Sequence, residues 1–120
     1  MTRPICIDFD GVIHGYQSRW QGATNLPDPP VPGAIEWLQQ LLTEDGIAPM
    51  IYSSRSKEPG GIDAMRAWLL LHGLTFAQLE QLHFPTQKPS AFLTIDDRAW
   101  CFTGKFPTAE QIRNFRTWQQ

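Results

Sequence analysis

Three short apolar runs along the chain end in polar residues. Residues 5–9, 47–52 and 92–95 are rich in β-branched and other apolar side chains, and each run is followed by carboxylates or hydroxyls. Runs of this length, bounded by turn-forming residues, are typical of strands buried on both faces. The pattern therefore predicts three buried strands, each followed by a loop that carries polar side chains.

Two segments between these runs have apolar residues at helical spacing. In 35–42 the pattern follows Pro32 and ends before Gly46, and in 62–72 it ends before Gly73. Proline near the start and glycine just past the end are common at helix boundaries. Strands that alternate with helices predict an α/β fold, a mostly parallel sheet flanked by helices.

Other segments give less regular patterns. Residues 14–32 contain several prolines and glycines, which predicts a long loop or flap that serves function. Thr75 with Gln78 is typical of a capping box at the start of a short helix, and 82–84 predicts a short strand.

The C-terminal part is expected to contribute to the core. Residues 100–102 predict a small additional strand, and Thr108 with Gln111 predicts the capped start of a closing helix. The apolar face of that helix would consist of Ile112, Phe115 and Trp118. Four aromatic residues are expected on helices, in the core or at an interface: Trp37, Trp68, Phe115 and Trp118.

The length and composition predict a single compact domain that comprises residues 1–120. The chain has 120 residues, of which 42% are hydrophobic and 18% charged, enough for one core. The formal charge is -2 and the basic residues are scattered, so nucleic acid is not a favoured partner. Cys6 and Cys101 are expected to be small core residues in a reducing compartment, with a disulfide between them as the alternative. Since no signal or membrane segment is recognised, we expect a cytoplasmic protein with no membrane partner.

The polar residues after the three strands should meet at one edge of the sheet. Asp8 and Asp10 follow the first strand, Ser53 the second, and Asp96 and Asp97 the third. In a parallel sheet the carboxyl ends of the strands lie at the same edge, where ligands bind. We therefore expect these five side chains to converge into one site.

Four converging carboxylates call for a cation. Close carboxylates repel one another unless they take up protons or bind a metal ion. Mg²⁺ is favoured because it binds through a few carboxylates, water and substrate phosphate, and no histidine or cysteine cluster indicates zinc. Lys88 would supply a fixed positive charge and Ser53 a hydroxyl for phosphoryl oxygens.

Four motifs resemble those of the haloacid dehalogenase-like hydrolases. They occur in the family's order as Asp8-Phe9-Asp10-Gly11-Val12, Ser53 in Ile-Tyr-Ser-Ser-Arg, Lys88 in Gln-Lys-Pro, and Asp96-Asp97 in Thr-Ile-Asp-Asp-Arg. The resemblance covers most of the chain. It implies a Rossmann-like domain and a magnesium-dependent phosphatase, and since the chain has no room for a cap domain, it resembles the capless members.

The resemblance also implies a role for each motif residue. Asp8 would attack phosphorus and form an aspartyl-phosphate. Asp10 would protonate the leaving oxygen and later activate water, while its backbone carbonyl would be a magnesium ligand. Ser53 and Lys88 would hold the phosphoryl group. Asp8 and one or both of Asp96 and Asp97, with Asp96 favoured, would be the carboxylate ligands.

Several alternatives stay open at this stage. The acidic residues and Ser53 are also typical helix caps or turn formers. Arg55 would bind phosphate or pair with Asp97, and His14 would contact substrate or form part of a turn. A signalling receiver domain also uses acidic residues and lysine, but there the lysine comes last. A phosphotransferase and a catalytically idle binding module are the remaining alternatives.

The class of phosphorylated substrate is open as well. Sugar phosphates, nucleotides, phosphoproteins and nucleic-acid phosphate ends are all compatible with the motifs. An open site and an aromatic C-terminal segment also allow a homodimer.

Overall fold

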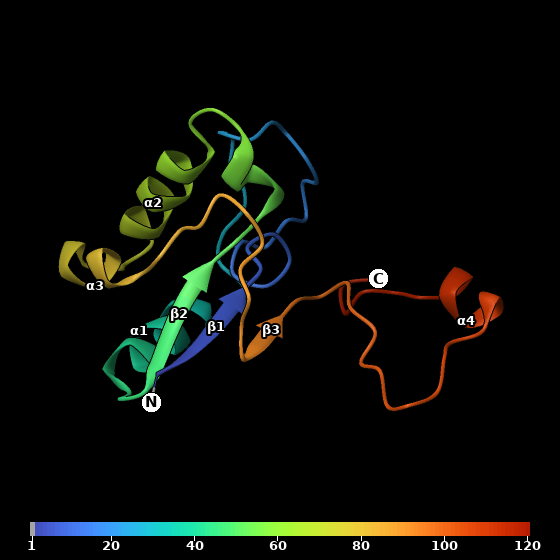
Figure 1. Ribbon diagram of the computed structural model, residues 1–120. Helices are drawn as coiled ribbons and strands as arrows, with labels where there is room; N and C mark the ends of the chain where they lie inside the picture. Colours follow the sequence, from blue (N-terminus) through green and yellow to red (C-terminus); the bar gives the residue numbers. More distant parts are fainter. Residues whose placement is uncertain (1) are drawn as a thin grey trace.

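A small parallel sheet is the centre of the fold. The computed structural model describes residues 2–120, and its strands are β1 (Arg3–Ile7), β2 (Ile47–Ile51) and β3 (Leu93–Ile95) (Figure 1). The strand order is β2-β1-β3, and β1 pairs in parallel with both neighbours. The α/β class and the parallel sheet predicted from the sequence are therefore confirmed, with three strands.

Helices follow the strands at the predicted places. The helices are α1 (Ala34–Thr43), α2 (Gly61–Leu71), α3 (Phe76–Gln81) and α4 (Ala109–Arg113), and η1 (Ser54–Lys57) is a 3-10 turn. The predicted capping boxes are present at α3 and α4, where Thr75 and Thr108 accept from the N–H groups of Gln78 and Gln111. Among the described residues, no helix has the length and apolarity needed to cross a membrane.

The core forms where the strands and helices pack. Ile7, Phe9, Leu38, Ile51 and Leu69 are completely enclosed, and burial of such apolar side chains is the main stabilising contribution to a fold of this size. Trp68 is also buried, as expected, and packs edge-on against Phe9. The core lies directly beneath the strand ends, so it holds the loops that follow β1 and β2 in place.

Residues 14–32 form the predicted long loop, and it is closely tied to the body. Its two ends run side by side, since the Gly15 N–H donates to the Pro29 carbonyl and the Val31 N–H to the Ile13 carbonyl. The indole N–H of Trp68 donates to the Asp28 carbonyl at 3.1 Å. The loop therefore forms an ordered wall beside the carboxyl end of β1.

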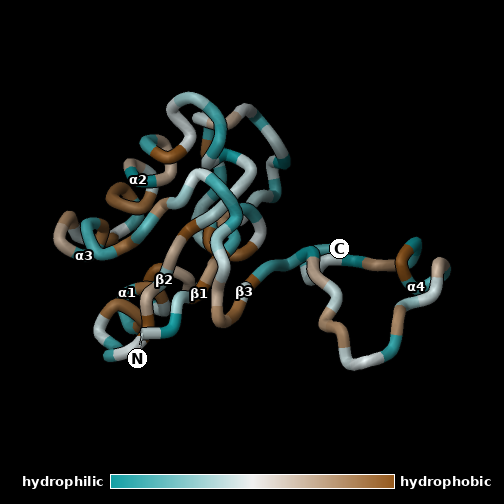
Figure 2. The backbone as a smooth tube through the Cα atoms, in the orientation of Figure 1, coloured by the Kyte–Doolittle hydropathy of each residue, from teal (hydrophilic) through white to brown (hydrophobic). Residues whose placement is uncertain are grey.

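The chain after β3 leaves the body and returns. We call residues 98–116 the arm; it extends away from the sheet and contains α4 (Figure 1). Figure 2 shows hydrophobic residues along it. Beyond the arm, Trp118 Nε1 donates to the Gly11 carbonyl at 2.7 Å and Gln119 Nε2 to the Gly15 carbonyl at 2.6 Å. The C-terminal residues are therefore anchored beside the loop that follows β1.

Several predictions for the C-terminal part are wrong. Residues 100–102 form no strand, because no neighbouring strand lies beside them in the described part of the chain. The closing helix ends at Arg113, so Phe115 and Trp118 lie outside it, and its Ile112 is exposed. Cys101 is exposed, whereas Cys6 is buried as expected.

The remaining difference concerns residues 82–84. They form a single bridge between His83 and Met50 instead of a strand.

Candidate active site

The predicted residues line one pocket at the carboxyl edge of the sheet. Asp8 directly follows β1, and its N–H donates to the Ile95 carbonyl of β3 at 2.9 Å. Asp96 and Asp97 directly follow β3. A pocket of about 490 Å³ is lined by all six residues predicted for the site, namely Asp8, Asp10, Ser53, Lys88, Asp96 and Asp97. The parallel strand order explains this convergence.

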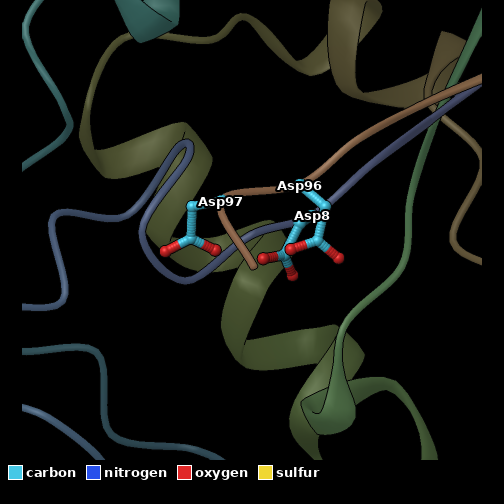
Figure 3. Close-up of side chains that lie close together, drawn as sticks. All are labelled: Asp8, Asp96 and Asp97. Atoms are coloured by element: carbon cyan, nitrogen blue, oxygen red, sulfur yellow. The ribbon is translucent and has the colours of Figure 1, made fainter. Parts of the chain in front are cut away.

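Three carboxylates form a compact cluster within this pocket. One oxygen from each of Asp8, Asp96 and Asp97 lies within 4.8 Å of the other two. Figure 3 shows the side chains of Asp8 and Asp96 next to each other, with Asp97 beside them. Asp96 is exposed, and Asp8 and Asp97 are partly buried. The Asp10 carboxylate is directed to other partners.

Gly11 allows Asp97 to reach this cluster. Its φ angle of 86° lies in the left-handed region, and a Cβ atom at this position would overlap the Asp97 carboxylate. A residue with a side chain would therefore both strain the backbone and displace Asp97. The glycine of the first motif is thus in direct contact with the acidic pair of the fourth.

The cluster carries more negative charge than its surroundings balance. Burial raises the pKa of Asp8 from its ordinary value of 3.8 to about 8, and the charge of Asp96 adds to the effect. Without a cation, Asp8 therefore holds a proton near neutral pH. Hard oxygen donors with excess negative charge are what Mg²⁺ requires, so this set of residues fits the ion.

Asp10 is held by two buried side chains. Arg55 Nε donates to both of its carboxylate oxygens, at 3.2 and 2.9 Å, and His14 Nδ1 lies 2.9 Å from Oδ1. Arg55 and His14 are both completely enclosed. Neither lines the pocket, so their side chains act on the site through Asp10.

The hydrogen bonds of His14 determine its tautomer. The backbone N–H of Asp28 donates to His14 Nε2 at 3.1 Å, so Nε2 is an acceptor and Nδ1 carries the proton. His14 therefore donates to the Asp10 carboxylate. Burial opposes ionisation of Asp28, but the hydrogen bonds from the Ser18 hydroxyl and N–H outweigh it and lower the pKa of Asp28.

Arg55 also ties the long loop to the site. Its Nη1 donates to the carbonyls of Gly22, Ala23 and Asn25, and its guanidinium lies 4.6 Å from the centre of the Trp20 ring. The sequence indicated two alternative partners for Arg55, a phosphate group and Asp97. The structure instead pairs it with Asp10 and the loop.

Ser53 has a structural contact as well as a place in the pocket. It is the N-cap of η1, and its Oγ accepts from the Arg55 N–H at 3.2 Å. Because a hydroxyl that accepts one bond keeps its own O–H for donation, Ser53 can still bind a ligand in the pocket. Lys88 is exposed and forms no ion pair with any residue of 2–120.

Besides the six predicted residues, the pocket is lined by six that sequence reasoning missed, namely Cys6, Tyr16, Tyr52, Ser54, Thr94 and Arg98. Arg98 and Tyr16 line the pocket, and Cys6 reaches its wall from β1. Burial raises the pKa of the Cys6 thiol, an effect that nearby Lys88 opposes. Arg98 directly follows the acidic pair, a position that signals a place at the same sheet edge. No comparable signal marks Tyr16, which comes from the irregular loop.

Neither the protein-family models nor the curated proteins include a relative of this chain. No protein-family model matches the chain, and no curated protein is significantly similar to it. The resemblance to haloacid dehalogenase-like hydrolases therefore rests on the four sequence motifs.

Proposed function

We propose that the protein is a magnesium-dependent phosphatase of the haloacid dehalogenase-like type, with a Rossmann-like fold, that hydrolyses a phosphomonoester through Asp8. The observation that carries the proposal is one pocket that contains the compact cluster of Asp8, Asp96 and Asp97 together with Lys88 and Ser53. A nucleophilic carboxylate, an ion site and donors for phosphoryl oxygens are the groups that phosphoryl transfer requires.

The ion would be held by carboxylate oxygens of Asp8, Asp96 and Asp97. When bound, Mg²⁺ supplies positive charge that offsets the negative charge of the phosphoryl oxygens. It also keeps Asp8 ionised, because a nearby cation opposes the rise in its pKa. The backbone carbonyl of Asp10 remains the proposed additional ligand.

In the first step, a carboxylate oxygen of Asp8 forms a bond to phosphorus while the bond to the leaving oxygen breaks. Lys88 and the Ser53 hydroxyl hold the phosphoryl oxygens. For this step Asp10 must enter protonated: it gives its proton to the leaving oxygen and, in the second step, takes one from the water that attacks the aspartyl-phosphate, which restores its protonated form. Arg55 and His14 orient the Asp10 carboxylate through their N–H donors.

The proposal is tested by hydrolysis of p-nitrophenyl phosphate. We expect magnesium-dependent release of nitrophenol by the wild type, none in excess chelator, and at least a hundredfold loss in Asp8→Asn, since that amide is not a nucleophile. Asp63→Asn is the matched control, because Asp63 is exposed on α2. Equal turnover by Asp8→Asn and Asp63→Asn would contradict the role of Asp8.

A folded wild type without hydrolysis would favour the other two functions. Transfer of the phosphoryl group to an added alcohol would then indicate a phosphotransferase. Binding of a phosphomonoester without turnover would indicate an idle binding module.

A further inference from the structure

The outer edge of β3 has no partner strand in the described part of the chain. β3 pairs with β1 on one side only, and within residues 2–120 no strand lies on its other side. The opposite edge of the sheet differs, because Ile51 of β2 donates its N–H to the His83 carbonyl. At the β3 edge, Phe92 and Leu93 are 63% and 51% exposed. An open edge with exposed apolar side chains favours pairing with another chain.

The arm exposes apolar side chains and unpaired backbone groups, which match those of the open β3 edge. Its side chains Trp100, Phe102, Phe106 and Ile112 are 48%, 56%, 86% and 62% exposed. Residues 99–107 make no backbone–backbone hydrogen bond to any described residue. Residues 100–102, which the sequence predicts to be a strand, therefore have strand-forming side chains and free backbone groups, but no strand of residues 2–120 lies beside them.

The arm and the body carry opposite charge. Residues 98–116 contain four basic residues and one acidic residue, a formal charge of +3. The rest of the chain contains six basic and eleven acidic residues, a formal charge of -5. Attraction between arm and body therefore favours a second copy of this chain as the arm's partner.

We propose that the arm of one copy covers the β3 edge of a second copy, with residues 100–102 lying beside β3 as an added strand. The arm extends away from the β3 of its own chain (Figure 1). A reciprocal exchange therefore gives both copies a covered edge and forms a closed two-fold dimer. The interface adjoins the candidate site, because Arg98 lines the pocket and begins the arm.

This interface does not depend on the proposed phosphatase function, and its first test is the mass of the protein in solution. We expect sedimentation velocity to give a dimer for the wild type over micromolar concentrations and a monomer for Phe102→Asp. Leu71→Asp is the matched control, because Leu71 is 79% exposed on α2, away from the arm. A monomeric wild type, a dimeric Phe102→Asp or a monomeric Leu71→Asp would each overturn the proposal.

The second test locates the contact between chains. A chain with Leu93→Cys and Cys101→Ser is mixed with the wild type under mild oxidation. We expect a disulfide between position 93 of one chain and Cys101 of the other, identified by peptide mass mapping, because the added strand brings these positions together. Absence of this cross-link in a dimeric mixture would overturn the proposed arrangement.

The same exposed aromatic and basic residues are also features of single-stranded nucleic-acid binding. An oligonucleotide is therefore added to the wild type and to Phe102→Asp. A monomeric wild type that binds it, with loss of binding in the variant, would assign the arm to nucleic acid and overturn the dimer.

Discussion

Arg55 shows how one buried side chain connects the long loop to the candidate site. It forms an ion pair with Asp10 and donates to three loop carbonyls while completely enclosed. A buried charge requires such partners, since its transfer from water is costly. Arg55 therefore both positions the Asp10 carboxylate and stabilises the loop.

We predict that Arg55→Ala lowers the free energy of unfolding by about 3–5 kcal/mol, because it removes a completely enclosed side chain that pairs with the partly buried Asp10 and with three loop carbonyls. Arg66→Ala, the control, should change it by no more than about 1 kcal/mol, since the ion pair of Arg66 with Glu80 is partly exposed. Urea denaturation measures both. Equal losses in the two variants would contradict the central role given to Arg55.

Asp8 should make stability depend on pH. Its pKa in the folded protein is raised from 3.8 to about 8, so between these values the folded state holds a proton that the unfolded state releases. The contribution of Asp8 to stability is therefore fully present below about pH 4 and is lost as the pH rises towards 8.

Urea denaturation in chelator from pH 5 to pH 8.5 tests this prediction. The stability of the wild type relative to Asp8→Asn should fall as the pH rises, because the amide does not titrate. Mg²⁺ should reduce the fall, since the ion replaces the proton in neutralising the cluster. Parallel pH profiles of the two proteins in chelator would show that Asp8 has an ordinary pKa.

At the scale of elements, the loops after β1 and β3 meet through Gly11 and Asp97. We predict that Gly11→Ala weakens magnesium binding at least tenfold, because the added methyl group displaces the Asp97 carboxylate. The substitution should also lower the free energy of unfolding by about 1–2 kcal/mol, because alanine is strained in the left-handed backbone conformation of this position.

Gly33→Ala separates these two effects. Gly33 has a similar φ angle of 85°, and an added Cβ there would meet no atom within 4 Å. This control should therefore lose stability but keep its affinity for magnesium in isothermal titration. Similar affinities in both variants would exclude the contact with Asp97 as a determinant of the ion site.

Helices and strands were predictable where local signals and burial agree. α1 has apolar spacing bounded by Pro32 and Gly46, α2 has apolar spacing that ends before Gly73, and α3 has a capping box, so their sequences indicate them without tertiary information. Residues 100–102 have strand-forming side chains, but a strand also needs a neighbour. That requirement is tertiary and is not encoded in the segment itself.

At the scale of the whole molecule, the place of the site follows from topology. Strands that alternate with helices predict a parallel sheet, and a parallel sheet brings Asp8, Ser53 and Asp96 to one edge. The contacts of Arg55 and the path of the arm were not predictable. They depend on how irregular segments fold back or extend, for which spacing and composition give no rule.

The central claim is that Asp8 becomes covalently phosphorylated. The most direct measurement is acid quenching of the enzyme during turnover of a phosphomonoester with Mg²⁺, followed by mass spectrometry of its peptides. We predict a phosphoryl group on the peptide that contains Asp8, released by hydroxylamine and absent from Asp8→Asn. The account is contradicted if the active enzyme carries the phosphoryl group on another residue. It is also contradicted if Asp8→Asn is phosphorylated to the same extent as the wild type.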